Sequence, residues 1–204
     1  MPKLPAVNAA AILSLCAAAL QLGMGLLLVG LARAPGWRAA RTFALIALTA
    51  FAYSAADVFF AMPSASESAL LWATRANFFM GSLHAVAWLL YTFGGPTASA
   101  RGMPLAAKVL ATVLAVSGLI IFLFGAPVVP GEWTDVSISW ANVHYRAPKM
   151  NQWGEGYATG VLLSLAVPFA GFIPRARRHE PGAWTHLIGF SVFFACMSVE
   201  VLVT

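Results

Sequence analysis

Six long apolar segments follow one another along the chain, and short polar connectors separate them. They cover about residues 6–32, 39–62, 68–93, 105–125, 156–173 and 183 onward. Each is roughly 20 residues long, which is the length that an α-helix needs to cross the hydrocarbon core of a bilayer. Because backbone groups cannot be left unpaired in hydrocarbon, the pattern predicts an all-α polytopic membrane helix bundle.

The composition agrees with a membrane solvent. Hydrophobic residues make up 60% of the chain and charged residues only 9%, whereas a soluble domain carries about 25% charged residues. This excludes a water-soluble globule and predicts one integral membrane domain over residues 1–204. The sixth segment runs to Thr204 without a basic flank. That ending predicts a further span and a cytoplasmic domain beyond it.

Basic residues concentrate in alternate connectors. These connectors hold Arg33, Arg38, Arg41, Arg101, Lys108, Arg175, Arg177 and Arg178. Positive residues mark the cytoplasmic side of membrane spans, so we expect the cytoplasmic (inner) membrane and a multi-pass topology with the N-terminus outside. The net charge of +5 does not indicate nucleic-acid binding, because the basic residues form no patch with interleaved aromatic residues.

One long connector, about residues 126–155, lies outside the membrane in this topology. Its aromatic residues are Trp133, Trp140, Tyr145 and Trp153. Tryptophan and tyrosine favour the headgroup layer, so we expect an interfacial loop that these residues anchor. Val136, Ile138 and Trp140 alternate with polar residues, so a short strand or hairpin also fits. The functional alternative is a lid over an external pocket.

Three ionisable residues lie inside the apolar segments, namely Asp57, Arg75 and Glu200. An unpaired charge in hydrocarbon costs at least about 2.5–3.5 kcal/mol. All three map to the outer half of the bilayer in the expected topology. They predict an outward-facing ligand pocket, with Arg75 between two carboxylates and Tyr53 on the same face as Asp57. The alternatives are a structural ion pair or side chains that extend to the nearby interface.

A stripe of polar, small and aromatic residues runs along the third segment. Its members are Asn77, Gly81, His84 and Trp88. Such a face is expected to pack against neighbouring helices. A haem between His84 and His186 is an alternative reading, but their depths differ by about 10 Å at 1.5 Å per residue. We therefore expect a hydrogen-bonded packing histidine at position 84, with no cofactor.

Other features indicate packing. Walker, nucleophile-elbow and HExxH motifs are missing, so we expect no enzyme in this stretch, and no residue spacing predicts a metal site. Small residues recur four apart, at Gly156 with Gly160 and at Ala52 with Ala56. Such pairs allow close helix approach in lipid.

The second and third segments carry a family resemblance. Residues 41–53 read Arg-Thr-Phe-Ala-Leu-Ile-Ala-Leu-Thr-Ala-Phe-Ala-Tyr, and the third segment opens with Leu71-Trp72-Ala73-Thr74-Arg75. This stretch, residues 41–93, resembles the N-terminal seven-transmembrane-helix sensor region of bacterial histidine kinases and diguanylate cyclases. There a Leu-Trp-x-x-Arg segment opens the third span, which Trp72 and Arg75 match. The resemblance implies a seventh helix and a cytoplasmic signalling module.

These observations predict a membrane-embedded sensory input domain that binds a small or lipophilic ligand and biases a cytoplasmic output module. Its mechanism would be a shift between two helix arrangements. The expected partners are the lipid bilayer and other membrane helices or a second copy. The alternative from another class is a non-catalytic accessory subunit of a larger membrane complex. A redox or transport protein that uses His84 or Asp57 is a third reading.

Overall fold

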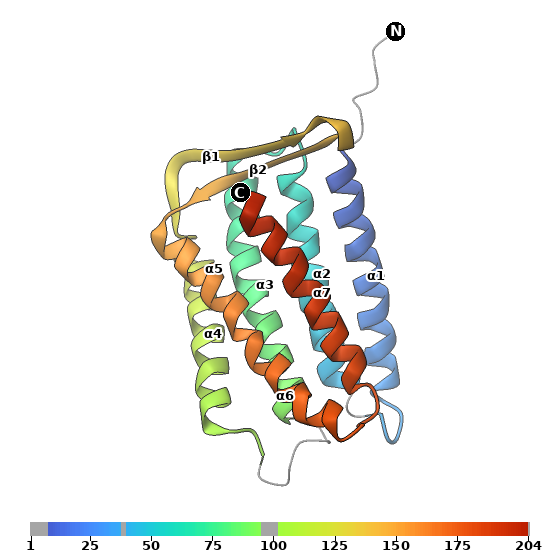
Figure 1. Ribbon diagram of the computed structural model, residues 1–204. Coiled ribbons are helices and arrows are strands. Elements are labelled where there is room, and N and C mark those ends of the chain that lie inside the picture. The colour runs from blue at the N-terminus through green and yellow to red at the C-terminus, as the bar shows by residue number, and fades with distance from the viewer. Residues whose placement is uncertain (1–7, 38–39, 95–101, 204) are drawn as a thin grey trace.

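The computed structural model describes residues 8–37, 40–94 and 102–203, and helices account for 74% of the chain. The helices stand side by side as a bundle, with a β-hairpin across one end (Figure 1). In chain order the elements are α1 (Ala9–Leu31), α2 (Ala40–Phe60), α3 (Glu67–Gly94), α4 (Leu105–Phe124), β1 (Val128–Ile138), the short 3₁₀ helix η1 (Ser139–Ala141), β2 (Val143–Met150), α5 (Gln152–Ser164), α6 (Ala166–Arg177) and α7 (Ala183–Val203).

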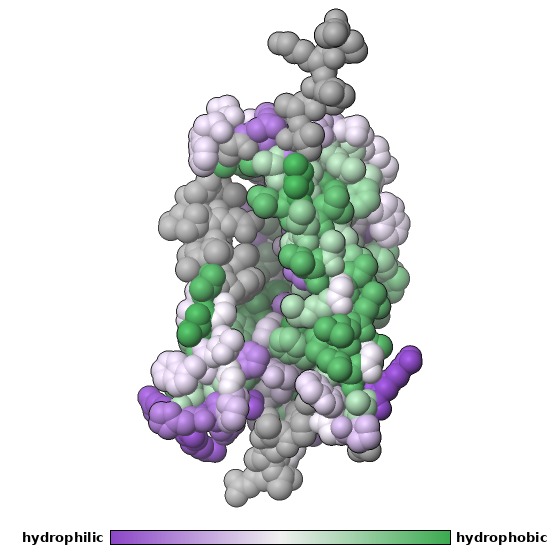
Figure 2. Space-filling model, turned by 90° about the vertical axis from the view of Figure 1, so that its right-hand side faces the viewer, coloured by the Kyte–Doolittle hydropathy of each residue, from purple (hydrophilic) through white to green (hydrophobic). Residues whose placement is uncertain are grey.

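Four segments in the described part are long and apolar enough to cross a membrane. They are α1, α2, α4 and the α5–α6 pair, Gln152–Arg177. The α3 helix is longer, at 28 residues, but polar residues such as Asn77 and His84 lower its hydropathy. On the face that Figure 2 shows, hydrophobic residues cover much of the middle of the bundle, and hydrophilic residues gather towards both ends. The prediction of a mostly helical membrane protein is confirmed at this level.

The basic connectors share one end of the bundle. The α1–α2 and α6–α7 connections and the first turn of α4 all lie at the end opposite the hairpin (Figure 1). Arg33, Arg41, Lys108 and Arg177 belong to these regions, while Arg38 and Arg101 lie outside the described residues. The two ends of the bundle therefore differ in charge, as the alternating connectors predict.

The segment expected at 156–173 is two helices that meet at Leu165. Proline lacks a backbone N–H, and its ring clashes with the carbonyl four residues earlier. For Pro168 that carbonyl belongs to Ser164, which is where α5 ends. The break lies at Leu165, which is buried in the core between the two helices.

The expected outer loop contains a two-stranded antiparallel sheet, so the chain is not all-α. Strands β1 and β2 pair Val136 with Tyr145 and Ile138 with Val143. This outcome is the hairpin alternative that the alternation of apolar and polar residues suggested. Between the strands, Lys149 Nζ donates a 2.8 Å hydrogen bond to Glu132 Oε2, and this bond raises the pKa of Lys149 above its usual value.

The hairpin covers the apolar ends of α2 and α3. Tyr145 packs on Phe60 with ring centroids 5.4 Å apart, and Trp133 lies against the same buried cluster. The guanidinium of Arg146 stacks 4.5 Å from the centroid of Trp133. It also lies 3.9 Å from the carboxylate of Glu67 at the start of α3. These contacts join the hairpin to the bundle, while Trp140 and Trp153 remain 89% and 84% exposed.

Asn8 fastens the hairpin to two helices. Its side-chain nitrogen donates 2.5 Å hydrogen bonds to the carbonyls of Ala61 and His144. Its side-chain oxygen accepts from Ala10 N at 3.1 Å, which caps α1, and from His144 N at 3.3 Å. Because Asn8 is only 6% exposed, these four bonds form away from water.

The α3 helix is the centre of the bundle and contacts α2, α4, α5, α6 and β2. Its serine Ser82, fully buried, lies 2.8 Å from the hydroxyl of Tyr157 on α5. The same hydroxyl lies 2.9 Å from Ser117 Oγ on α4. One tyrosine therefore joins three helices. Nearby, a Cβ on Gly118 of α4 would meet Ser82 Cβ at 2.9 Å, so α3 and α4 touch closely here.

Candidate functional site

The face of α3 with the polar stripe lies against α2. Asn77 Nδ2 donates a 2.6 Å hydrogen bond to Asp57 Oδ1. One turn further along, a Cβ on Gly81 would lie 3.7 Å from the ring of Tyr53. The next member of the stripe is His84, whose Nδ1 lies 3.1 Å from Thr49 Oγ1 on α2. Polar contacts thus run along the α2–α3 interface through the apolar part of the bundle.

The hydrogen bonds of His84 determine its tautomer. Trp88 Nε1–H is only a donor, and it lies 3.0 Å from His84 Nε2, so Nε2 must accept. Nδ1 then carries the proton and donates to Thr49 Oγ1. The threonine hydroxyl is free to accept because it donates to the carbonyl of Leu45 at 2.8 Å. The imidazole is therefore neutral with both nitrogens occupied.

We expect NMR to find this tautomer. Long-range proton–nitrogen spectra of the chain labelled at histidine should show His84 as the Nδ1–H form. Substituting Trp88→Phe removes the donor to Nε2 and should shift that nitrogen resonance most. The matched comparison is His144, whose Nδ1 lies 3.0 Å from Ser137 Oγ on the hairpin and should not change. An Nε2–H form of His84 would contradict the assigned network.

An aromatic cluster joins this stripe to α7. Trp88 packs on Phe190 with ring centroids 4.6 Å apart and lies 5.9 Å from His186. His186 Nε2 also lies 3.1 Å from the hydroxyl of Tyr91, one turn from Trp88 on α3. Phe172 of α6 closes the cluster, with its ring centroid 4.7 Å from that of His186. Aromatic side chains from three helices therefore meet at one level of the bundle.

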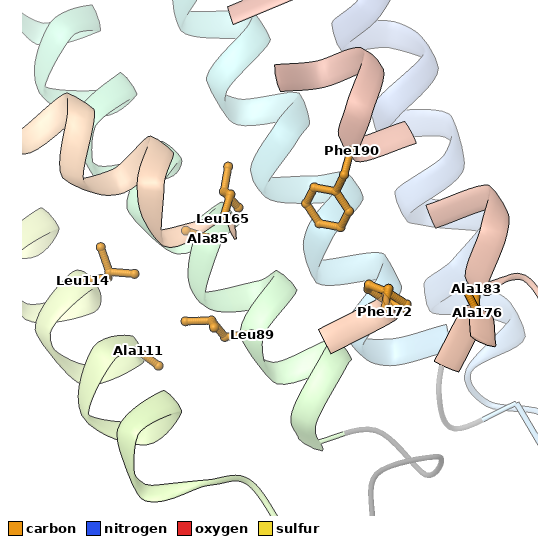
Figure 3. Close-up of a cluster of buried hydrophobic side chains, with 9 residues drawn as sticks. All are labelled: Ala85, Leu89, Ala111, Leu114, Leu165, Phe172, Ala176, Ala183 and Phe190. Carbon is orange, nitrogen blue, oxygen red and sulfur yellow. The ribbon is translucent and has the colours of Figure 1, made fainter. Parts of the chain in front are cut away.

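A cavity of about 250 Å³ lies beside this cluster. Its lining residues are His84, Trp88, Leu165, Thr185, His186, Gly189 and Phe190. Leu165 and Phe190 lie with Ala85 and Leu89 in the apolar core of the bundle (Figure 3). The site combines apolar walls with a few polar groups, which is typical of small-molecule pockets.

Contacts of α7 distinguish it from the other helices. In the described part of α7, contacts are made with α6 and, through His186 and Phe190, with α3, while α3 packs closely on α2 and α4. A Cβ added to Gly189, on the cavity side of α7, would meet nothing within 4 Å. The cavity therefore leaves open space beside Gly189, while the neighbouring Phe190 of α7 packs directly on Trp88 of α3.

The outward-facing pocket was predicted from four residues, Asp57, Arg75, Glu200 and Tyr53. Asp57 and Tyr53 lie at the α2–α3 interface. Arg75 lies elsewhere: its guanidinium stacks 4.9 Å from the Trp72 ring and approaches Gly125 at the end of α4. Two residues separate Arg75 from Asn77, so these side chains point to different sides of α3. Glu200 belongs to α7, but its side chain lies outside the described part, and the predicted trio stays a prediction.

Both histidines of the haem alternative line the cavity, with Trp88 between them. Coordination of an iron by His84 would require breaking its bond to Trp88 or to Thr49. In the part of the chain that the structure describes, no three His, Cys, Asp or Glu residues are close enough to hold a metal ion.

Sequence reasoning did not identify several cavity residues. Thr185, Gly189 and Phe190 lie in the last apolar segment, where they look like packing residues. Tyr91 follows the stripe by three residues and could have been added to it on helical spacing.

Comparison of the chain with protein-family models, curated proteins and solved structures gives no match.

Proposed function

We propose that this chain is a membrane-embedded sensory input domain that binds a small lipophilic ligand in the cavity between α3 and α7. The observation that carries the proposal is the cavity itself. It has aromatic and apolar walls, two histidines and Thr185 on its lining, and about 250 Å³ of space. A flat apolar molecule with one hydroxyl or carbonyl group matches this lining, because the walls favour its rings and the polar groups fix its orientation.

The mechanism follows from the uneven packing of the bundle. A ligand shifts a conformational equilibrium only when it binds one state better than the other. Occupation of the cavity bridges Trp88 on α3 and Gly189 on α7, so it favours the arrangement in which α7 stands close to α3. The cytoplasmic end of α7, beside the α6–α7 connection, then passes the binding state to an output module on that side. Such a change needs no movement of the α3–α4 contact.

The proposed topology adds α3 and α7 to the four apolar spans, which gives six spans in the inner membrane with the N-terminus outside. The basic end of the bundle supports this orientation, because positive residues are retained on the cytoplasmic side. The hairpin then lies at the outer surface, where exposed Trp140 and Trp153 suit the headgroup layer. Residues Asp57, Arg75, Glu200 and Tyr53 remain a second proposed ligand position near that surface.

The test uses 1-naphthol, a flat aromatic probe with one hydroxyl group, and the purified chain in lipid nanodiscs. Substituting Gly189→Leu fills the cavity and should weaken naphthol binding by about tenfold or more, since about 1.4 kcal/mol corresponds to a factor of ten. The matched control is Gly160→Leu on α5, where an added Cβ also meets nothing within 4 Å but the cavity is untouched. Equal affinity of both variants would reject the cavity as the site.

A second measurement tests sensing itself. Spin labels at the exposed residues Ile188 on α7 and Val113 on α4 report the distance between these helices. The labels are placed in a Cys16→Ala, Cys196→Ala background. Saturating naphthol should change the distance distribution, and Gly189→Leu should make it insensitive to the probe. An unchanged distribution despite measured binding would favour the accessory-subunit alternative.

A further inference from the structure

A second pocket lies at the basic end of the bundle, between the end of α1 and the start of α2. Its volume is about 290 Å³. Its lining residues are Val29, Ala32, Arg33, Arg41 and Ala44. Three of them are apolar and belong to or adjoin the spanning helices, while the two arginines are exposed. The pocket thus presents paired guanidinium groups beside an apolar wall.

The two arginines lack acidic partners within the described part of the chain. The ion pairs there involve Arg146, Lys149 and Arg175. Glu180, the acidic residue of the α6–α7 connection, is already 2.8 Å from Arg175. Arg33 and Arg41 therefore place two positive charges at one pocket, and these charges favour an anion from outside the chain. Guanidinium groups bind phosphate oxygens through paired hydrogen bonds.

The position of the pocket indicates where that anion comes from. Arg33 follows the last residue of α1 by two positions, and Arg41 is the second residue of α2. Both therefore lie at the border between the apolar band and the polar end. Trp37, in the same connection, is 54% exposed, as expected for a residue in the headgroup layer. Val29 and Ala44 continue the pocket towards the hydrocarbon, where an acyl chain would run.

We propose that this pocket binds the phosphate headgroup of an acidic phospholipid from the adjoining leaflet. The arginines hold the phosphate, and the groove between α1 and α2 receives the glycerol and the first part of an acyl chain. A bound lipid would fix the α1–α2 end of the bundle. The proposal needs only that α1 and α2 span the membrane, so it is independent of the cavity beside α7.

The test measures lipid binding to the whole chain by native mass spectrometry from a neutral detergent. The probes are phosphatidylglycerol and phosphatidylcholine with the same acyl chains. The double variant Arg33→Gln/Arg41→Gln should bind phosphatidylglycerol roughly thirtyfold more weakly, since each basic residue near an anionic lipid contributes about fivefold. Its control is Lys108→Gln/Arg178→Gln, which removes the same charge from exposed residues at the same end. The control should change affinity by no more than about twofold.

Three results would overturn the proposal. Equal weakening in both double variants would mean general attraction between charges and no site. Phosphatidylcholine carries the same phosphate but no net charge. Equal binding of the two lipids would therefore mean that the pocket does not select a lipid with a net negative charge. Binding of glycerol 3-phosphate as tightly as the lipid would identify a site for a soluble anion. Circular dichroism and thermal unfolding of each variant establish that it is folded before its affinity is compared.

Discussion

Asn8→Ala is expected to detach the β-hairpin from the bundle and to lower the free energy of unfolding by about 3–7 kcal/mol. The substitution leaves the carbonyls of Ala61 and His144 without their donor in a buried site. Each unsatisfied buried group costs about 1–3 kcal/mol. The loss of the cap on Ala10 N at the start of α1 adds about 1 kcal/mol.

Two variants separate these contributions. Asn8→Asp keeps an oxygen that caps α1 but removes both donated hydrogen bonds, so its effect should be close to that of alanine. Asn151→Ala is the matched control, because the side-chain oxygen of Asn151 caps α5 by accepting one 3.0 Å hydrogen bond from Gly154 N. It should cost about 1 kcal/mol.

Equilibrium unfolding in mixed micelles gives these free energies, and hydrogen exchange shows where the structure loosens. In Asn8→Ala, amides of β2, Val143–Met150, should exchange faster, while those in the middle of α3 should not. An effect no larger than that of Asn151→Ala would show that the hairpin is held chiefly by its aromatic contacts.

Hydropathy predicted most helix bounds closely. The segments expected at 39–62, 68–93 and 105–125 correspond to α2 (Ala40–Phe60), α3 (Glu67–Gly94) and α4 (Leu105–Phe124). The reason is physical: in a membrane the length of an apolar helix follows from the thickness of the hydrocarbon layer. The hairpin was less predictable, because its strands depend on contacts such as Tyr145 on Phe60, which join residues far apart in the sequence.

Close helix contacts could not be predicted from small-residue spacing. The pair Gly156 and Gly160 suggested an interface, yet an added Cβ at either position meets nothing within 4 Å. The close contacts are at Gly25, Gly118 and Gly171 instead. A Cβ added at any of these positions would lie less than 3 Å from a side chain of a neighbouring helix. Spacing shows that a face is smooth, but it does not show whether a neighbour lies there.

The relation of His84 to His186 also depended on tertiary structure. Counting residues from the ends of the segments assumes straight, parallel helices, and it places the two histidines about 10 Å apart in depth. In the bundle α7 crosses obliquely in front of α2 and α3 (Figure 1). His186 lies level with Trp88 and Tyr91, which are four and seven residues beyond His84 on α3 and thus about 6–10 Å further along the helix, in agreement with that offset. Counting residues predicts how deep a residue lies along its own helix, but it does not predict the angle between two helices.

Gly118→Leu is expected to destabilise the centre of the bundle by about 2–5 kcal/mol. Overpacking costs about 1–3 kcal/mol, because an added Cβ would already lie 2.9 Å from Ser82 Cβ and 3.0 Å from its hydroxyl oxygen. Separation of α4 from α3 also prevents Tyr157 from reaching both Ser82 and Ser117, and each lost hydrogen bond costs about 1 kcal/mol.

The measurement is again equilibrium unfolding, with Gly160→Leu as the control that adds the same side chain in open space. Tyr157→Phe removes the hydroxyl alone and should account for about 1–2 kcal/mol of the loss. A cost for Gly118→Leu no greater than that of Gly160→Leu would mean that α4 moves away freely. In that case the α3–α4 contact would not be fixed, and the proposed mechanism would lose the close helix contact relative to which α7 is proposed to shift.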